Sequence, residues 1–288
     1  MSEKPRICLV LDDRERRVYQ HSEIRSLLEN GYEIPLVLVD SSFEPQDDVD
    51  LEGGLPTQLV WFVKWMASGK FSALIYAERK VAELINPSSA VAGEVAKLKL
   101  REDVRKIEGL EESEFVEFSP IKTGEYTYEF PDEMIDKITD TADVVVLLGF
   151  NKILRGRILT APEHGVLSFH GSDIRRYRGR PPGFFQYIND EDEIGVTLQQ
   201  LTEELDGGKL VLCEHADISD ATSWHEVQLR IYETYGSLLV RGLENLQEES
   251  FTPETPDELG ELTYQSEGDK LGNVAKCFKR NITRRYIE

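Results

Sequence analysis

The sequence predicts an α/β fold in which a mostly parallel, twisted sheet carries helices on both faces. Three observations favour this class. Apolar runs of about five residues, typical of buried strands, recur along the chain, and segments with helical periodicity separate them. The first such unit has the order strand, helix, strand, which joins parallel strands. No internal repeat and no long low-complexity tract interrupts the pattern, so a solenoid is not expected.

The amino-terminal half predicts the first strand-helix-strand unit followed by a helical enlargement. In order, we expect a strand at Ile7–Leu11, an amphipathic helix over 14–29, a strand at Pro35–Val39, an acidic loop over 41–54, a helical enlargement over 55–108 and a strand over 114–121. The enlargement contains the aromatic residues Trp61, Phe62 and Trp65, which we interpret as a packing surface rather than a ligand pocket.

The remaining half predicts the central and later strands. In order, we expect a helix from Pro131 to Ala142, a central strand at Val144–Leu148, a short helix over 152–159, a strand over 165–171, a helix starting at 181–188, strands at 194–198 and 209–213, and a helix over 222–248 capped by Thr222 or Ser223. Residues 1–249 would form one domain with a catalytic core at 143–245, and 250–288 a short C-terminal extension. We expect the basic run at 279–285 to be solvated.

The composition is strongly acidic. Among 288 residues, 33 Lys and Arg stand against 54 Asp and Glu, a formal net charge of −21. Such a surface repels phosphate backbones and anionic lipids, which disfavours general nucleic-acid or membrane binding. Cys8, Cys213 and Cys277 are odd in number and far apart, and no signal segment or membrane-length apolar run occurs. We therefore expect a cytoplasmic protein with reduced thiols.

Several familiar signatures are missing from the sequence. The first apolar run is followed by Asp12-Asp-Arg-Glu-Arg16, with no glycine-rich dinucleotide fingerprint. Neither a phosphate-binding P-loop nor a Gly-x-Ser-x-Gly nucleophile elbow occurs. The five histidines are not paired at metal-ligand spacing, so the sequence predicts no metal site.

The segment from 166 to 206 carries the candidate chemistry. Because side chains alternate in a strand, Ser168 and His170 share one face, at the end where open α/β sheets bind ligands. Four arginines follow within 175–180, and they could either hold an anionic group or neutralise neighbouring carboxylates. Asp206, in Leu205-Asp-Gly-Gly208, is taken alone a typical turn residue.

Together these motifs resemble the folate-dependent formyltransferase family, in particular the N-terminal catalytic domain of methionyl-tRNA formyltransferases. The resemblance rests on Gly165-Val-Leu-Ser-Phe-His-Gly-Ser-Asp-Ile-Arg-Arg-Tyr-Arg-Gly179, Gly195-Val-Thr197 and Leu205-Asp-Gly-Gly208, in this order. Leu148-Gly-Phe-Asn-Lys-Ile-Leu154 resembles the family's folate-pocket turn. The chain departs from the family at Ser168, where the family has a catalytic Asn, and at Ile174-Arg175, where it has Leu-Pro.

The resemblance implies formyl transfer from 10-formyltetrahydrofolate to a primary amine through a tetrahedral intermediate. His170 would hydrogen-bond the formyl oxygen, Asp206 would accept a proton from the amine and favour the charged imidazole, and Ser168 would keep one hydrogen-bond donor. The acceptor would be a small, anionic metabolite, an amino sugar nucleotide or a ribonucleotide. A formyltetrahydrofolate hydrolase and a silent folate- or nucleotide-binding module are the alternatives.

The resemblance also implies binding residues. Those expected to contact folate are Phe150, Ile153, Leu154, Glu204 and Leu205, and those expected to hold the acceptor are Arg175, Arg178 and Arg180. The family's tRNA-formylating members add a basic C-terminal barrel, whereas only 249–288 follow the last predicted helix of this acidic chain. We therefore expect a small-molecule acceptor rather than tRNA, and a homodimer stays open.

Overall fold

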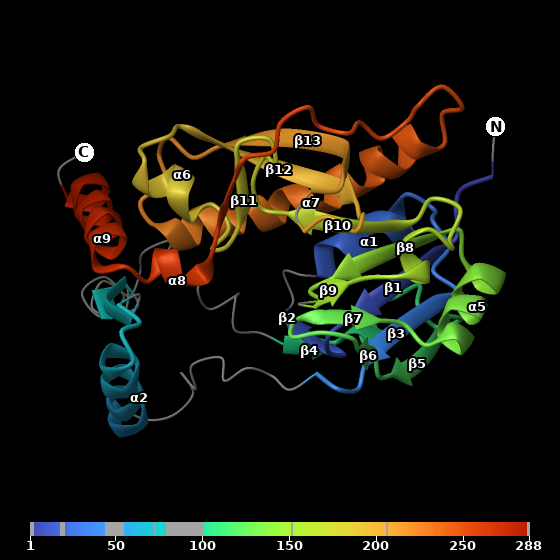
Figure 1. Ribbon diagram of the computed structural model, residues 1–288, viewed down its shortest axis with the longest axis horizontal. Helices are drawn as coiled ribbons and strands as arrows, with labels where there is room; N and C mark the ends of the chain where they lie inside the picture. The colour runs from blue at the N-terminus through green and yellow to red at the C-terminus, as the bar shows by residue number, and fades with distance from the viewer. Residues whose placement is uncertain are drawn as a thin grey trace.

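A computed structural model shows a seven-stranded mixed sheet as the centre of the protein (Figure 1). It describes residues 3–17, 21–43, 55–71, 73–75, 77–78, 101–150, 152–205 and 207–286. The strand order is β13 (Lys209–Asp217), β12 (Glu193–Gln200), β10 (Val166–His170), β8 (Val144–Leu148), β1 (Ile7–Leu11), β3 (Leu36–Asp40) and β5 (Glu114–Phe118). The strands β10, β8, β1, β3 and β5 are parallel to one another, whereas β12 pairs antiparallel with both of its neighbours, β10 and β13.

Helices cover both faces of this sheet, as the sequence predicts. One face packs against α1 (Ser22–Glu29) and α7 (Trp224–Leu246), and the other against α5 (Asp132–Thr141) (Figure 1). Alternate residues of the central strands feed the two cores, so Leu9 lies toward α1 and α7 while Val10 lies toward α5. Every residue of β1 and β8 is buried, because both faces are covered. The long helix α7 is capped by Ser223, one of the two predicted caps.

The predicted helix over 14–29 is wrong in its first part. Residues Glu15–Arg17 form the short strand β2, which pairs antiparallel with β4 (Arg101–Asp103), and α1 begins only at Ser22. The run Arg14-Glu-Arg-Arg17 supplies no apolar side chain that a helix could turn toward the core. Backbone pairing with β4 and burial of the Arg16 side chain decide the conformation instead.

The helical enlargement is observed in part. Helix α2 (Leu55–Ala67) lies within the predicted range, but the last residues of that range form β4 and the 3₁₀ turn η2 (Val104–Lys106) instead of a helix. Most of the expected acidic loop, from 44 to 54, lies outside the described residues, as do 79–100. The partly buried Phe62 and Trp65 lie on α2.

The predicted short helix over 152–159 is also replaced. Its residues form β9 (Ile153–Leu154), in a small sheet with β6 (Ile121–Lys122) and β7 (Thr127–Glu129), and the turn η3 (Arg157–Leu159). Gly156 separates the two pieces with φ of 80°, a backbone conformation that a helix does not contain. Helix α6 (Phe184–Ile188) follows at the predicted place.

The C-terminal residues return to the body of the protein. Strand β14 (Glu261–Thr263) pairs with β11 (Tyr177–Gly179), and α8 (Gln265–Gly268) and α9 (Leu271–Tyr286) follow (Figure 1). The expectation of a solvated basic run is wrong at Arg280, which is buried and pairs with Asp190 at 3.0 Å. Among the helices described, none has the length and apolarity needed to span a bilayer.

Candidate active site

The carboxyl edge of the parallel strands carries the candidate site. Strands β1 and β8 lie side by side at the centre, and the chain leaves them in opposite directions across the sheet. Such a switch in strand order opens a crevice where α/β proteins bind ligands. The loops after β1, β3, β8 and β10 all reach this edge, and each brings at least one polar side chain to it.

Strand β10 supplies Ser168 and His170. The predicted alternation is confirmed: Leu167 is buried in the core beneath α7, and Phe169 stacks on Tyr235 of that helix at 4.2 Å. Ser168 is half-buried and His170 is only 8% exposed, at the last position of the strand. His170 Nε2 lies 3.2 Å from the carbonyl oxygen of Tyr177, and because a carbonyl only accepts, this nitrogen carries the proton.

The arginines after β10 are largely engaged with carboxylates. Arg175 forms two side-chain hydrogen bonds of 2.9 Å with Asp173, Arg176 lies 3.1 Å from Glu191, and Arg178 lies 3.6 Å from Glu204. Arg180 is exposed. For these three arginines the structure therefore matches the alternative in which the cations neutralise neighbouring acids.

Arg178 links His170 to the segment that contains Asp206. Its guanidinium donates to the carbonyl oxygens of Leu205, at 3.3 Å, and Gly260, at 2.8 Å. Tyr177, its neighbour, accepts the His170 hydrogen bond. Asp206 itself lies outside the described residues, so its pairing with His170 stays a prediction, but Leu205 is joined to the loop that holds the imidazole.

The expected folate turn lies beside the same edge. Phe150 is half-buried and meets Phe130 edge-to-face at 6.0 Å, Ile153 is half-buried, and Leu154 is buried in the core beneath α5. Leu154 therefore contributes packing, whereas Phe150 and Ile153 keep accessible surface. Glu204 is exposed, and Leu205 is half-buried.

Sequence reasoning missed an ion pair at this turn. The Lys152 ammonium contacts the carboxylate of Asp40 and the hydroxyl of Ser42, the latter at 2.8 Å, and lies 4.9 Å from the ring of Tyr128. Asp40 is the last residue of β3 and is nearly inaccessible. A polar residue ending a buried parallel strand is the signal that marks His170, and it could have marked Asp40 as well.

A second missed group is a buried polar cluster behind β1, made of Arg16, His21 and Glu23. Arg16 donates to the carbonyl of Leu148 at the end of β8. Gly149, with φ of 77°, makes room for it, since a Cβ there would lie 3.1 Å from the guanidinium. Within the described part of the chain, Arg16 Nε and both ring nitrogens of His21 have no hydrogen-bond partner.

Burial shifts the protonation of this cluster. It raises the pKa of Glu23 to about 7, although Arg16 opposes the shift. Burial also lowers the pKa of His21, and the charge of Arg16 adds to that effect. Near neutral pH the cluster therefore holds one guanidinium, a largely neutral imidazole and a carboxyl group that is partly protonated.

The chain is similar to proteins of one family. The model of that family, described as "Formyl transferase", matches residues 92–243, more than half of the chain. Methionyl-tRNA formyltransferase of Fusobacterium nucleatum is 28% identical over 139 residues, 48% of this chain and 41% of that protein. The chain thus spans less than half the length of this curated relative.

Two solved structures share the fold. Glycinamide ribonucleotide transformylase 1 from Symbiobacterium toebii aligns with a TM-score of 0.52 and 12% identity, over 89% of this chain and 96% of that one. An N-formyltransferase from Helicobacter canadensis, in complex with folinic acid and dTDP-3-aminofucose, aligns with a TM-score of 0.51 and 11% identity, over 98% and 82%. The family model covers β8, the turn that follows it and His170 at the end of β10, and because it matches more than half of the chain, the chain belongs to the formyl transferase family.

Proposed function

We propose that the protein transfers the formyl group of 10-formyltetrahydrofolate to the primary amine of a small anionic metabolite. The proposal is supported by membership of the formyl transferase family and by folinic acid in a structure with the same fold. We infer the class of acceptor from two proteins that share this fold. One is named for glycinamide ribonucleotide, and the other is in complex with the amino sugar nucleotide dTDP-3-aminofucose. One observation carries the proposal: a nearly buried histidine ends the strand beside the central crevice, with one ring nitrogen held by a backbone carbonyl.

In the proposed reaction the amine nitrogen attacks the formyl carbon. A C–N bond forms, the carbonyl oxygen becomes an oxyanion, and the bond from the formyl carbon to N10 of the folate then breaks. The amine loses one proton to Asp206, and N10 gains one as tetrahydrofolate leaves. The charged imidazole of His170 donates to the oxyanion, and a buried donor stabilises such charge better than water does.

The residues at the edge fit a folate. Phe150 and Ile153 offer accessible apolar surface to an aromatic ring system, and Glu204 and Leu205 are accessible as well. For the acceptor, Arg180 presents an exposed guanidinium. Arg175 and Arg178 would have to exchange a carboxylate for a substrate anion.

Turnover of variants tests the assignment. With 10-formyltetrahydrofolate and a panel of amines, the wild-type protein should release tetrahydrofolate only when an amine is present. His170→Ala and Asp206→Ala should each lower kcat by about 10²-fold or more, the usual contribution of a proton-transfer or oxyanion group. His164→Ala is the matched control, because His164 precedes the opposite end of the same strand.

The other outcomes separate the alternatives. Release of tetrahydrofolate without amine would make the protein a hydrolase, and folate binding without turnover would make it a silent module. Rates near the wild-type value in both the His170 and Asp206 variants would contradict the proposed site. Circular dichroism and the melting temperature establish that each variant is folded.

Ser168 provides a separate prediction about the oxyanion. If its hydroxyl donates to the formyl oxygen, Ser168→Ala should lower kcat about ten- to hundredfold, somewhat less than the loss of a full oxyanion donor. Ser168→Asn places the longer amide of the family at this half-buried position and should keep turnover. An unchanged kcat in Ser168→Ala would show that the serine takes no part.

A further inference from the structure

One face of the β12–β13 hairpin gathers metal-ligating side chains. Because side chains alternate, the even-numbered residues of β12 enter the core beneath α7 and the odd-numbered residues face away from it. Across the two strands, Glu193 pairs with Asp217, Gly195 with His215, and Thr197 with Cys213. His215 and Cys213 are two residues apart on β13 and therefore project side by side.

Gly195 lets a third ligand reach this face. A Cβ at position 195 would lie 2.6 Å from the Cβ of Asp173, closer than real Cβ atoms approach, so Asp173 occupies the space that a side chain would fill. The ligand atoms of Asp173, Cys213 and His215 consequently all lie within 4.8 Å of one another. Three strong ligand types, from strand β13 and from the loop after β10, thus converge on one point.

The neighbours of Asp173 and Cys213 orient them as ligands. Asp173 Oδ1 accepts from the backbone amide of Arg175 at 3.0 Å and from its Nε at 2.9 Å, whereas Oδ2 accepts from Nη2 at 2.9 Å. A carboxylate oxygen has two lone pairs, so Oδ2 retains one. The Thr197 hydroxyl lies 3.7 Å from the sulfur of Cys213. Partners of this kind fix the direction of metal ligands.

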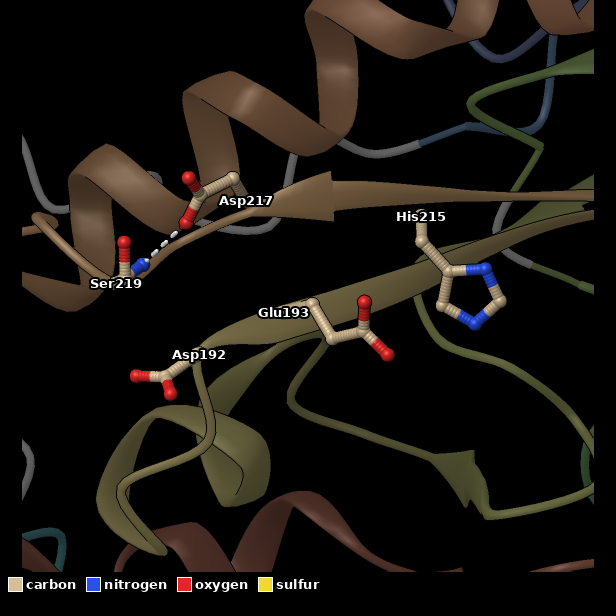
Figure 2. A pocket seen from close by; sticks show the side chains of 5 residues that line it. All are labelled: Asp192, Glu193, His215, Asp217 and Ser219. Carbon is tan, nitrogen blue, oxygen red and sulfur yellow. Dashed lines mark hydrogen bonds between the residues drawn. The ribbon is translucent and has the colours of Figure 1, made fainter.

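An acidic pocket adjoins the cluster at His215. A cavity of about 760 Å³ is lined by Asp192, Glu193, His215, Asp217 and Ser219. The imidazole of His215 on β13 lines this pocket. In Figure 2 the carboxylate of Glu193 points toward that imidazole. Negative side chains at the mouth of a pocket raise the local concentration of cations, so the exposed imidazole stands at an entrance that favours them.

We propose that Asp173, Cys213 and His215 bind a divalent transition metal of the zinc class, with the fourth coordination position open to water. A thiolate and an imidazole select zinc or cobalt over magnesium and calcium, which prefer oxygen ligands. The expectation of no metal site rested on the spacing of histidines alone. Here the signal is a Cys-x-His pair on one strand face, completed by a carboxylate from 40 positions earlier.

The ligands on β13 lie apart from His170, whereas Asp173 pairs with Arg175, which we expect to hold the acceptor. His170 pairs with Thr197, and Thr197 pairs with Cys213, so the cysteine lies two strands away from the catalytic candidate. At the usual strand spacing this places the two backbones about 10 Å apart. Metal binding can therefore be measured on the protein without folate or acceptor, so that its failure is distinguishable from a failure of formyl transfer.

Cobalt provides the optical test. The full-length protein, treated with chelator and titrated with Co²⁺, should develop thiolate-to-cobalt charge-transfer absorption in the near ultraviolet that saturates at one equivalent. Zn²⁺ should abolish it by displacement. Cys213→Ser should remove the absorption, whereas Cys277→Ala, at a buried cysteine on α9, should keep it.

A second ligand variant guards against a folding defect. His215 is exposed, so His215→Ala should leave the fold intact and weaken Co²⁺ binding at least tenfold, while His225→Ala should leave it unchanged. Absence of the charge-transfer absorption in the wild-type protein would overturn the proposal. So would its survival in Cys213→Ser, because the metal would then be bound elsewhere.

Discussion

Glu23 is a carboxyl group whose ionisation opposes folding. It is 2% exposed on α1, and Ser22 supplies a hydrogen bond of 3.2 Å. Arg16 attracts the carboxylate, but burial dominates and raises its pKa to about 7. Between the ordinary carboxyl pKa and this value the folded state binds more protons than the unfolded chain, so stability falls as the pH rises through that range and levels off above it.

The variant Glu23→Gln should remove this dependence. A rise of the pKa to about 7 corresponds to a loss of about 3 kcal/mol at pH 8 relative to acidic solution. We expect the variant to match the wild-type free energy of unfolding near or below about pH 4 and to exceed it at pH 8, by up to that amount. Urea unfolding at both pH values measures the difference.

The matched control for this experiment is Glu29→Gln, an exposed residue of the same helix. Because its side chain is exposed, this substitution relieves no burial of a carboxylate and should leave the free energy of unfolding at pH 8 close to that of the wild-type protein. Burial lowers the pKa of His21, which acts in the opposite direction, with stability lost as the pH falls. A Glu23→Gln variant less stable than the wild type at pH 8 would mean that Arg16 holds the carboxylate ionised.

Residues differ in how far the sequence predicts their role. Ser168 and His170 could be assigned to one face of a strand because alternation within a short apolar run is a local property. Arg16 could not, since its partner is the carbonyl of Leu148, 132 positions away. The arginines at 175–180 were ambiguous for the same reason, because the acids that pair with them include Glu191 and Glu204.

Among the secondary-structure elements, the strands that are buried on both faces are the ones that the sequence predicts well. Strands β1 and β8 are continuous apolar runs that are covered on both sides. A run of only five residues is typical of a buried parallel strand and is short for a helix. Strand β2 and strand β4 are short and polar, and only their mutual pairing makes them strands. The fold class could therefore be predicted, whereas the small sheets around the site could not.

Gly195 provides a prediction about the β12–β13 hairpin. Gly195→Ala should lower the free energy of unfolding by about 1–3 kcal/mol, the usual range for an overpacked site, because the new Cβ meets both Asp173 Cβ and its backbone nitrogen. Chemical denaturation measures the loss. If the metal proposal also holds, the same variant should bind Co²⁺ more weakly, since Asp173 must move.

Gly272→Ala on α9 is the comparison for that variant. Nothing lies within 4 Å of a Cβ at position 272, and alanine favours a helix, so no loss of stability is expected. Equal stability of the Gly195→Ala and wild-type proteins would show that Asp173 yields easily, which would remove the steric reason for the glycine.

For the whole molecule, the charge of −21 sets how the fold depends on salt. Among the described residues, many cations pair with acids at the surface, for example Arg6 with Asp143, Arg230 with Asp220 and Arg157 with Asp136. Such pairs at the surface each contribute little, whereas the excess negative charge repels itself throughout the compact state. The unfolded chain separates these charges, so repulsion favours unfolding and screening should weaken it.

Raising NaCl from about 0.05 M to about 0.5 M should therefore raise the melting temperature, since the screening length falls several-fold over that range. KCl should give the same increase, because general screening does not distinguish the two monovalent cations. A scanning measurement in each salt checks the prediction. A falling melting temperature would mean that screened ion pairs outweigh the released repulsion, and a rise with one cation alone would point to a specific binding site instead.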